Sequence, residues 1–122
     1  MQNPVRWFEI YVKDMKRAKA FYQKVFKIKF TKIISPGLEM WGFPSNPKEW
    51  GSSGSLVKMK GLTPSGVGTI IYFGSKDCAV EEKRIKPAGG KIHRAKISIG
   101  PHGFITLGID TEGNMFGIHS MK

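Results

Sequence analysis

The first thirty residues alternate between strand-like and helix-like patterns of apolar and polar positions. Residues 5–12 are rich in aromatic and β-branched side chains, interrupted by Arg6 and Glu9, which favours a strand. Asp14 follows and suits a helix N-cap, because its carboxylate can accept a backbone N–H at the helix start. Apolar residues then recur at i, i+3 and i+4 spacing, which predicts a helix with one buried face: Met15, Ala18, Phe21, Tyr22, Val25 and Phe26. Residues 28–34 favour a returning strand.

The same order recurs in the second half of the chain. A strand-like run at 68–73 is followed by Asp77 at a turn, a helical segment at 78–86 and a strand at 91–96. Asp14 and Asp77 lie 77 − 14 = 63 residues apart, about half the chain, which indicates an internal repeat. Coincidence is the alternative, because the order strand, helix, strand is common.

The remaining patterns predict four further strands and the segments that join them. The strands are expected at 38–43, 55–60, 104–109 and 115–120, with loops at 44–54 and 98–103 and a joint between the halves at 61–66. The last two strands should pair as a hairpin across 111–114, where Gly113 and Asn114 can adopt positive φ.

Strand alternation assigns side chains to two faces. In the first strand Phe8, Ile10 and Val12 form the apolar set that the helix must cover. Trp7, Glu9 and Tyr11 should therefore lie on the other face. In the second half, Phe116 and Ile118 should contact the second helix, whereas the opposite set faces away from it: Ile70, Tyr72, Gly74, Met115, Gly117 and His119.

Residues 7–22, the stretch 104–120 with its Asp-x-x-Gly-Asn turn, and Ala88-Gly89-Gly90-Lys91 resemble glyoxalase/bleomycin-resistance/dioxygenase proteins, the vicinal oxygen chelate superfamily. The resemblance implies an α+β fold of two βαβββ modules forming a curved mixed sheet with a concave cup. It implies one domain, residues 1–122, with modules at about 1–62 and 67–122. Lys27 departs from this pattern, because the family usually has Gly at this helix end.

Metal-binding members of this family supply His, Gln or Glu at equivalent strand positions. The resemblance maps these positions to Trp7, Ile70 and Gly117, none of which can ligate, so we expect no catalytic metal and no other cofactor. An atypical ligand set of Glu9 and His119, with His102 or Glu39, is the alternative.

The expected binding site is therefore the cup itself. Trp7, Tyr11 and Tyr72, with Met40 or Trp41, would supply apolar walls, and His102 and His119 would add ligand contacts. Glu9 is the candidate catalytic residue, either fixing a donor or cation of the ligand or acting as a general base. A purely structural ion pair between Glu9 and a nearby Arg or Lys is the competing interpretation.

Composition agrees with a single soluble domain. The chain has 122 residues, of which 40% are hydrophobic and 24% charged. No apolar run approaches the ~20 residues needed to span a bilayer, and Met1-Gln2-Asn3-Pro4 lacks a signal-peptide apolar region. The single cysteine, Cys78, excludes an internal disulfide and suits the cytoplasm.

The net charge of +11 is unusual, and eight Lys or Arg residues lie between positions 13 and 32 against Asp14 alone. Such a segment attracts anions such as nucleic acid, acidic lipid or a small carboxylate or phosphate, although a solvated helix exterior explains it as well. We predict a metal-independent small-molecule-binding protein that forms a homodimer. A metal-dependent lyase or dioxygenase is the first alternative, and a basic nucleic-acid-binding module is the second.

Overall fold

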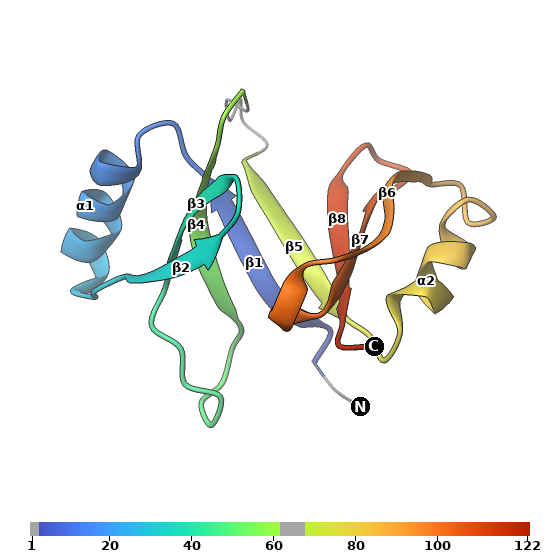
Figure 1. The fold of residues 1–122 in the computed structure, drawn as a ribbon, viewed down its shortest axis with the longest axis horizontal. Coiled ribbons are helices and arrows are strands. Elements are labelled where there is room, and N and C mark those ends of the chain that lie inside the picture. The colour runs from blue at the N-terminus through green and yellow to red at the C-terminus, as the bar shows by residue number, and fades with distance from the viewer. Residues whose placement is uncertain (1–2, 62–67) are drawn as a thin grey trace. The chain divides into compact units, whose positions relative to one another are not determined.

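The computed structural model of the protein describes residues 3–61 and 68–122. It divides into two compact units, Trp7–Thr69 and Met1–Arg6 with Ile70–Lys122. The described residues of each half run in the order strand, helix and three strands (Figure 1), which confirms the predicted α+β class and the two βαβββ modules. Most of the predicted joint at 61–66 lies outside the described residues.

The first unit is a mixed four-stranded sheet with one helix. Its elements are β1 (Val5–Tyr11), α1 (Met15–Phe26), β2 (Thr31–Ser35), β3 (Leu38–Gly42) and β4 (Ser53–Met59). The strand order is β2-β3-β4-β1, in which β1 and β4 are parallel and the other pairs antiparallel. The strand predicted from residue 28 begins only at Thr31.

Helix α1 begins where its pattern predicts, but its apolar stripe is only partly buried. Met15 is buried and Tyr22 half-buried, whereas Phe21, Val25 and Phe26 are exposed, so the predicted burial of these three is wrong. The backbone N–H of Arg17 donates to Asp14 Oδ1 at 2.9 Å, which satisfies one unpaired donor of the first turn. The Tyr22 ring on α1 lies 5.6 Å from the Phe43 ring, which in turn lies 5.3 Å from the Phe8 ring of β1. Phe8 therefore faces α1, as strand alternation predicts.

Helix α1 ends at Lys27, which adopts the left-handed conformation with φ 54° and ψ 49°. A side chain in this conformation carries a steric cost that glycine avoids, so we expect Lys27→Gly to raise the free energy of unfolding by about 1 kcal/mol. Urea denaturation measures the change. Lys29→Gly, at an exposed position without positive φ, is the control and should not stabilise the protein. Equal effects of the two variants would contradict the prediction.

The second unit repeats the arrangement. Its elements are β5 (Thr69–Gly74), α2 (Cys78–Ile85), β6 (Lys91–Ser98), β7 (Phe104–Ile109) and β8 (Met115–Ser120), with a 3₁₀ turn at Gly100–His102 inside the predicted loop. The strand order is β5-β8-β7-β6, with β5 and β8 parallel. The β6–β7 register shifts twice, between Ile92 and Arg94 and between Arg94 and Ile97.

The core of the second unit lies between α2 and the sheet. Cys78, Ile85 and Ile118 are buried together, and Ile92, Phe104 and Phe116 pack against them. Asp77 caps α2 by accepting the N–H of Ala79 at 3.0 Å, as its position at the predicted turn indicates. The predicted contact of Phe116 and Ile118 with the second helix is confirmed.

The final hairpin is closed by Asp110. Its Oδ1 accepts the backbone N–H groups of Glu112 at 2.8 Å and Asn114 at 2.9 Å. Gly113 has φ 85°, as predicted. Asn114 does not have positive φ, so Gly113 is the residue of this turn that uses the left-handed region. Among the described residues, no helix is long and apolar enough to cross a membrane.

Candidate functional site

The face of β1 opposite to α1 carries a hydrogen-bonded pair. The Tyr11 hydroxyl donates to Glu9 Oε1 at 2.8 Å, and both side chains are half-buried. Phe8 points the other way, toward α1. The predicted faces of β1 are therefore confirmed, and alternation places Trp7 beside Glu9 and Tyr11.

The pKa of the Tyr11 phenol is raised far above its ordinary value of 10.0. Burial is the largest cause, because it disfavours the phenolate, and the negative charge and hydrogen bond of Glu9 act in the same direction. Tyr11 therefore remains a proton donor to Glu9 throughout the physiological pH range.

This shift predicts how Tyr11 ionises and how stability depends on alkaline pH. We expect phenolate absorbance to show that Tyr11 of the folded protein fails to titrate near pH 10. Glu9→Gln should lower the pKa of Tyr11 only in part, because the burial of the phenol remains. The unfolded chain loses this proton near pH 10 whereas the folded chain keeps it, so stability should fall as pH rises past that value. Tyr11→Phe should remove the anomalous group, and normal titration of every tyrosine would contradict the prediction.

Strands β3 and β4 extend the face that carries Glu9 and Tyr11. The register aligns Glu9 with Ser55, and Tyr11 with Val57, which pairs in turn with Met40. Met40 and Ser55 are buried, and the Ser55 hydroxyl has no hydrogen-bond partner among the described residues. The sequence analysis did not identify Ser55, because β4 also contains Ser53 and Lys58 and nothing in the sequence distinguishes the buried serine from them.

Trp41 lies on the opposite face, which corrects its predicted placement beside Tyr11. The register aligns Trp41 with Leu56 and Ile10 on the α1 side of the sheet. Lys19 Nζ of α1 lies 3.2 Å from the centre of the Trp41 ring, and the indole N–H donates to Glu39 Oε2 at 3.2 Å. Of the two alternatives for this position, Met40 is the residue that shares the face of Tyr11.

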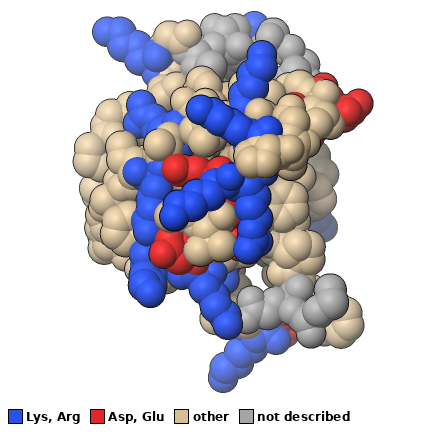
Figure 2. Space-filling view, turned by 90° about the vertical axis from the view of Figure 1, so that its right-hand side faces the viewer, with Lys and Arg blue, Asp and Glu red and all other residues tan. Residues whose placement is uncertain are grey.

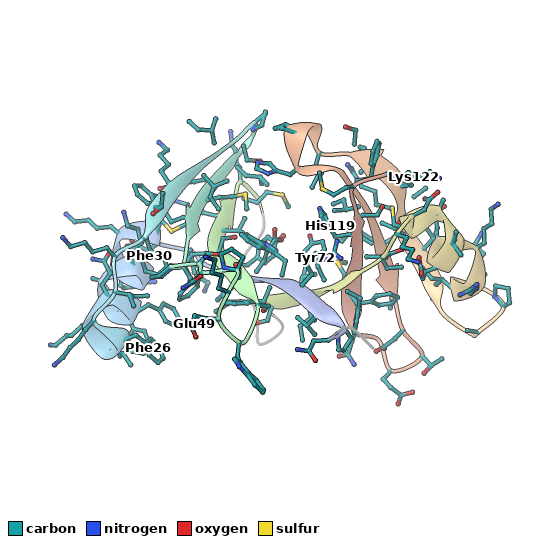
Figure 3. All side chains as sticks on the ribbon, turned by 90° about the horizontal axis from the view of Figure 1, so that it is seen from below. Phe26, Phe30, Glu49, Tyr72, His119 and Lys122 are labelled. Carbon is teal, nitrogen blue, oxygen red and sulfur yellow. The ribbon has the colours of Figure 1, made fainter. Side chains whose placement is uncertain are left out.

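In the second unit, Tyr72 and His119 (both labelled in Figure 3) belong to adjacent strands, β5 and β8. Tyr72 is buried and its ring covers Gly117. His119 Nε2 donates to the backbone carbonyl of His102 at 2.6 Å, and Arg6 Nη1 donates to Nδ1 at 3.5 Å. Because a guanidinium only donates and a carbonyl only accepts, these partners assign the acceptor role to Nδ1 and the donor role to Nε2. The His102 ring itself is exposed.

The three positions to which the resemblance maps the family's metal ligands hold residues that do not fit a divalent ion. Trp7 offers an indole, Ile70 an alkyl chain and Gly117 no side chain, and none has a lone pair suited to a metal. In the alternative set, Glu9 and Glu39 project from opposite faces of one sheet, since Glu39 bonds Trp41 on the α1 side. Within 3–61 and 68–122, no three His, Cys, Asp or Glu residues form a group that could hold a metal ion.

Solved structures with a similar fold include proteins of known and unknown activity. A methylmalonyl-CoA epimerase variant from Streptomyces coelicolor, in complex with 2-nitronate-propionyl-CoA, is 14% identical over 98% of each chain, with a TM-score of 0.70. The epimerase from Mycobacterium tuberculosis is 12% identical over 98% of this chain and 88% of its own, also at 0.70. The hypothetical protein BH1468 from Bacillus halodurans C-125 is 16% identical over 100% of this chain and 96% of its own, at 0.77. At such identities the likeness shows the fold alone.

The sequence itself carries a family signature. No curated protein matches it closely enough to count as a relative. Residues 5–117, nearly the whole chain, match the pattern described as "Glyoxalase/Bleomycin resistance protein/Dioxygenase superfamily". The chain therefore belongs to the glyoxalase/bleomycin resistance protein/dioxygenase superfamily.

Proposed function

We propose that this protein binds a small aromatic or amphipathic molecule on the face of the first unit's sheet that lies away from α1, without a catalytic metal. The hydrogen-bonded pair of Tyr11 and Glu9 on that face supports the proposal most directly. It places a carboxylate of fixed orientation beside an aromatic ring in a half-buried setting, which is the usual composition of a small-molecule site.

The side chains around the pair suit a flat ligand with a polar end. Trp7 and Tyr11 offer aromatic surface, and Met40 adds a thioether that adapts to irregular shapes. A carboxylate accepts several hydrogen bonds at once, so Glu9 can bind a ligand cation or donor while it accepts from Tyr11. The Streptomyces coelicolor epimerase described above is in complex with 2-nitronate-propionyl-CoA, which agrees with small-molecule binding on this fold.

We propose Glu9 as the catalytic group of this site, because the hydrogen bond from the Tyr11 hydroxyl to Oε1 fixes the orientation of the carboxylate. Tyr72, His102 and His119 belong to the second unit, and we propose them as ligand contacts of that unit considered by itself. A cytoplasmic homodimer completes the proposal, and it rests on the single thiol of Cys78 and on the family resemblance.

A pair of ligands that differ only in charge tests the proposal. Phenethylamine is cationic at pH 7, whereas 2-phenylethanol has the same ring and is neutral. We expect ligand-observed NMR to detect binding of both, with phenethylamine about tenfold tighter because of the Glu9 carboxylate. Glu9→Gln should remove the preference for the cation. Elemental analysis of natively purified protein accompanies the test, and a stoichiometric divalent ion would contradict the metal-free part.

Glu39→Gln is the matched control for this experiment. It removes the same charge from the same sheet, but on the face where Trp41 and α1 lie, so it should leave the preference unchanged. Equal losses in the two variants would show that the net charge of the protein, and not the Glu9 site, attracts the cation. Absence of binding by either ligand would count against the site.

A further inference from the structure

Helix α1 exposes three large apolar side chains to solvent. The exposed fractions of Phe21, Val25 and Phe26 are 60%, 54% and 61%. We call these three residues the α1 patch. Exposed apolar side chains that lie singly need no explanation, but a group of them on one element indicates an interaction surface.

The α1 patch is continuous with the core of its own unit. The Phe21 ring meets the Tyr22 ring edge-on at 5.1 Å, and the Phe26 ring stacks on Tyr22 at 6.3 Å. Tyr22 in turn packs against Phe43. The two exposed rings are therefore held in place by half-buried neighbours, which lowers the entropic cost of ordering them on binding.

Cations surround the α1 patch. Arg17 and Lys24 lie at i−4 and i+3 from Phe21 and so flank it on the helix surface, and Lys27 and Lys29 follow the helix end. All four are exposed. The acid of this segment, Asp14, is engaged at the helix start through the N–H of Arg17. The surroundings of the patch are therefore strongly positive.

The surface near α2 provides a contrast. Figure 2 faces the side of the molecule that carries α2 and shows acidic side chains among the blue Lys and Arg side chains. Lys96 there forms an ion pair with Asp77 at 2.8 Å. Within residues 3–61 and 68–122, by contrast, Arg17, Lys24, Lys27 and Lys29 form no ion pair, although Asp14 lies close to Arg17.

We propose that the α1 patch docks on an anionic lipid surface. Apolar side chains set among Lys and Arg match a bilayer interface, where the rings enter the acyl boundary and the cations meet acidic headgroups. The 12-residue helix lies on such a surface, because about 18 Å of helix is too short to cross a ~30 Å hydrocarbon core. A second copy of this chain brings the same cations to the same place and is repelled. A polyanion such as nucleic acid engages the cations and leaves the apolar patch without a role.

Vesicle co-sedimentation tests the proposal with the intact protein. We expect little binding to phosphatidylcholine vesicles and binding to vesicles with about 30% phosphatidylglycerol that falls steeply with added salt. The double variant Phe21→Ser/Phe26→Ser should weaken the apparent partition about tenfold or more, since each ring leaves the interface. Val80→Ser, at a 45% exposed site on α2, is the apolar control and should bind as the parent does. Far-UV circular dichroism and urea midpoints verify that the variants fold.

Two double variants that each remove two positive charges separate the effect of charge beside the patch from the effect of the protein's net charge. Arg17→Gln/Lys24→Gln beside the patch should reduce partition about tenfold, whereas Lys83→Gln/Lys86→Gln at α2 should reduce it far less. Equal effects of the two pairs would overturn the proposal, as would equal binding to neutral vesicles. Two further results would also contradict the proposal. If the double Phe variant binds vesicles normally but no longer forms a dimer in size-exclusion mass measurements, the patch contacts a second copy. If a DNA oligonucleotide competes with vesicles and the double Phe variant still binds it, the surface binds nucleic acid.

Discussion

Replacing Gly117 by alanine is expected to lower the free energy of unfolding by about 1–3 kcal/mol, the usual cost of overpacking a filled site. A Cβ at this position would lie 2.2 Å from Cδ1 of the Tyr72 ring, closer than two carbons can approach. The ring is buried, so it has little room to move away. Chemical denaturation of the single variant, monitored by tryptophan fluorescence, gives the value.

The Tyr72→Ala background identifies the clash as the cause. Tyr72→Ala removes the ring that a new methyl group would meet, so Gly117→Ala should then cost much less than it does in the parent. The difference between the two costs is the coupling energy of the pair. If Gly117→Ala is equally damaging in both backgrounds, the close approach to Tyr72 is not the reason for glycine at this position.

Replacing Glu82 by alanine is expected to cost about 2–4 kcal/mol, because it removes the acceptor of two hydrogen bonds to a charged group. Glu82 Oε1 on α2 accepts the backbone N–H of Lys96 on β6 at 2.5 Å and the hydroxyl of Thr106 on β7 at 2.8 Å. Thr106 is fully buried, so its hydroxyl would be left without a partner. Denaturation measures the loss, and hydrogen exchange at the Lys96 amide should accelerate beyond the global change.

Glu82→Gln is the matched control for that variant. The glutamine keeps an oxygen in place of Oε1 and removes only the charge, so it should cost less than half as much as alanine. A glutamine variant as unstable as the alanine variant would show that charge, and not the acceptor, is what α2 contributes to β6 and β7.

Local patterns in the sequence were sufficient to predict the elements. The spacing of Met15, Tyr22 and Phe26 predicted the extent of α1, and Asp14 and Asp77 cap the two helices as expected. These signals depend on residues within one or two turns of each other, and such interactions survive in any fold that buries the apolar stripe. The face shared by Glu9 and Tyr11 was predictable for the same reason, since residues two apart in a strand point the same way.

Contacts that depend on distant residues were not predictable. Whether Met40 or Trp41 joins the face of Tyr11 is decided by the β3–β4 register, which aligns Met40 with Val57 and Trp41 with Leu56. An aromatic ring in a strand says nothing about that register. The bond from Arg6 to His119 joins residues 113 positions apart, and no local pattern connects them.

The double register shift in β6 has a consequence for how the protein behaves at high concentration. β6 is the last strand in its sheet order, and such a strand presents backbone groups that could template fibrillar assembly with other molecules. The two irregularities interrupt the straight ladder that a foreign strand would need, and the exposed cations Lys91 and Arg94 repel an identical strand. Concentrated solutions of this chain should therefore remain dispersed without amyloid-like growth from this edge.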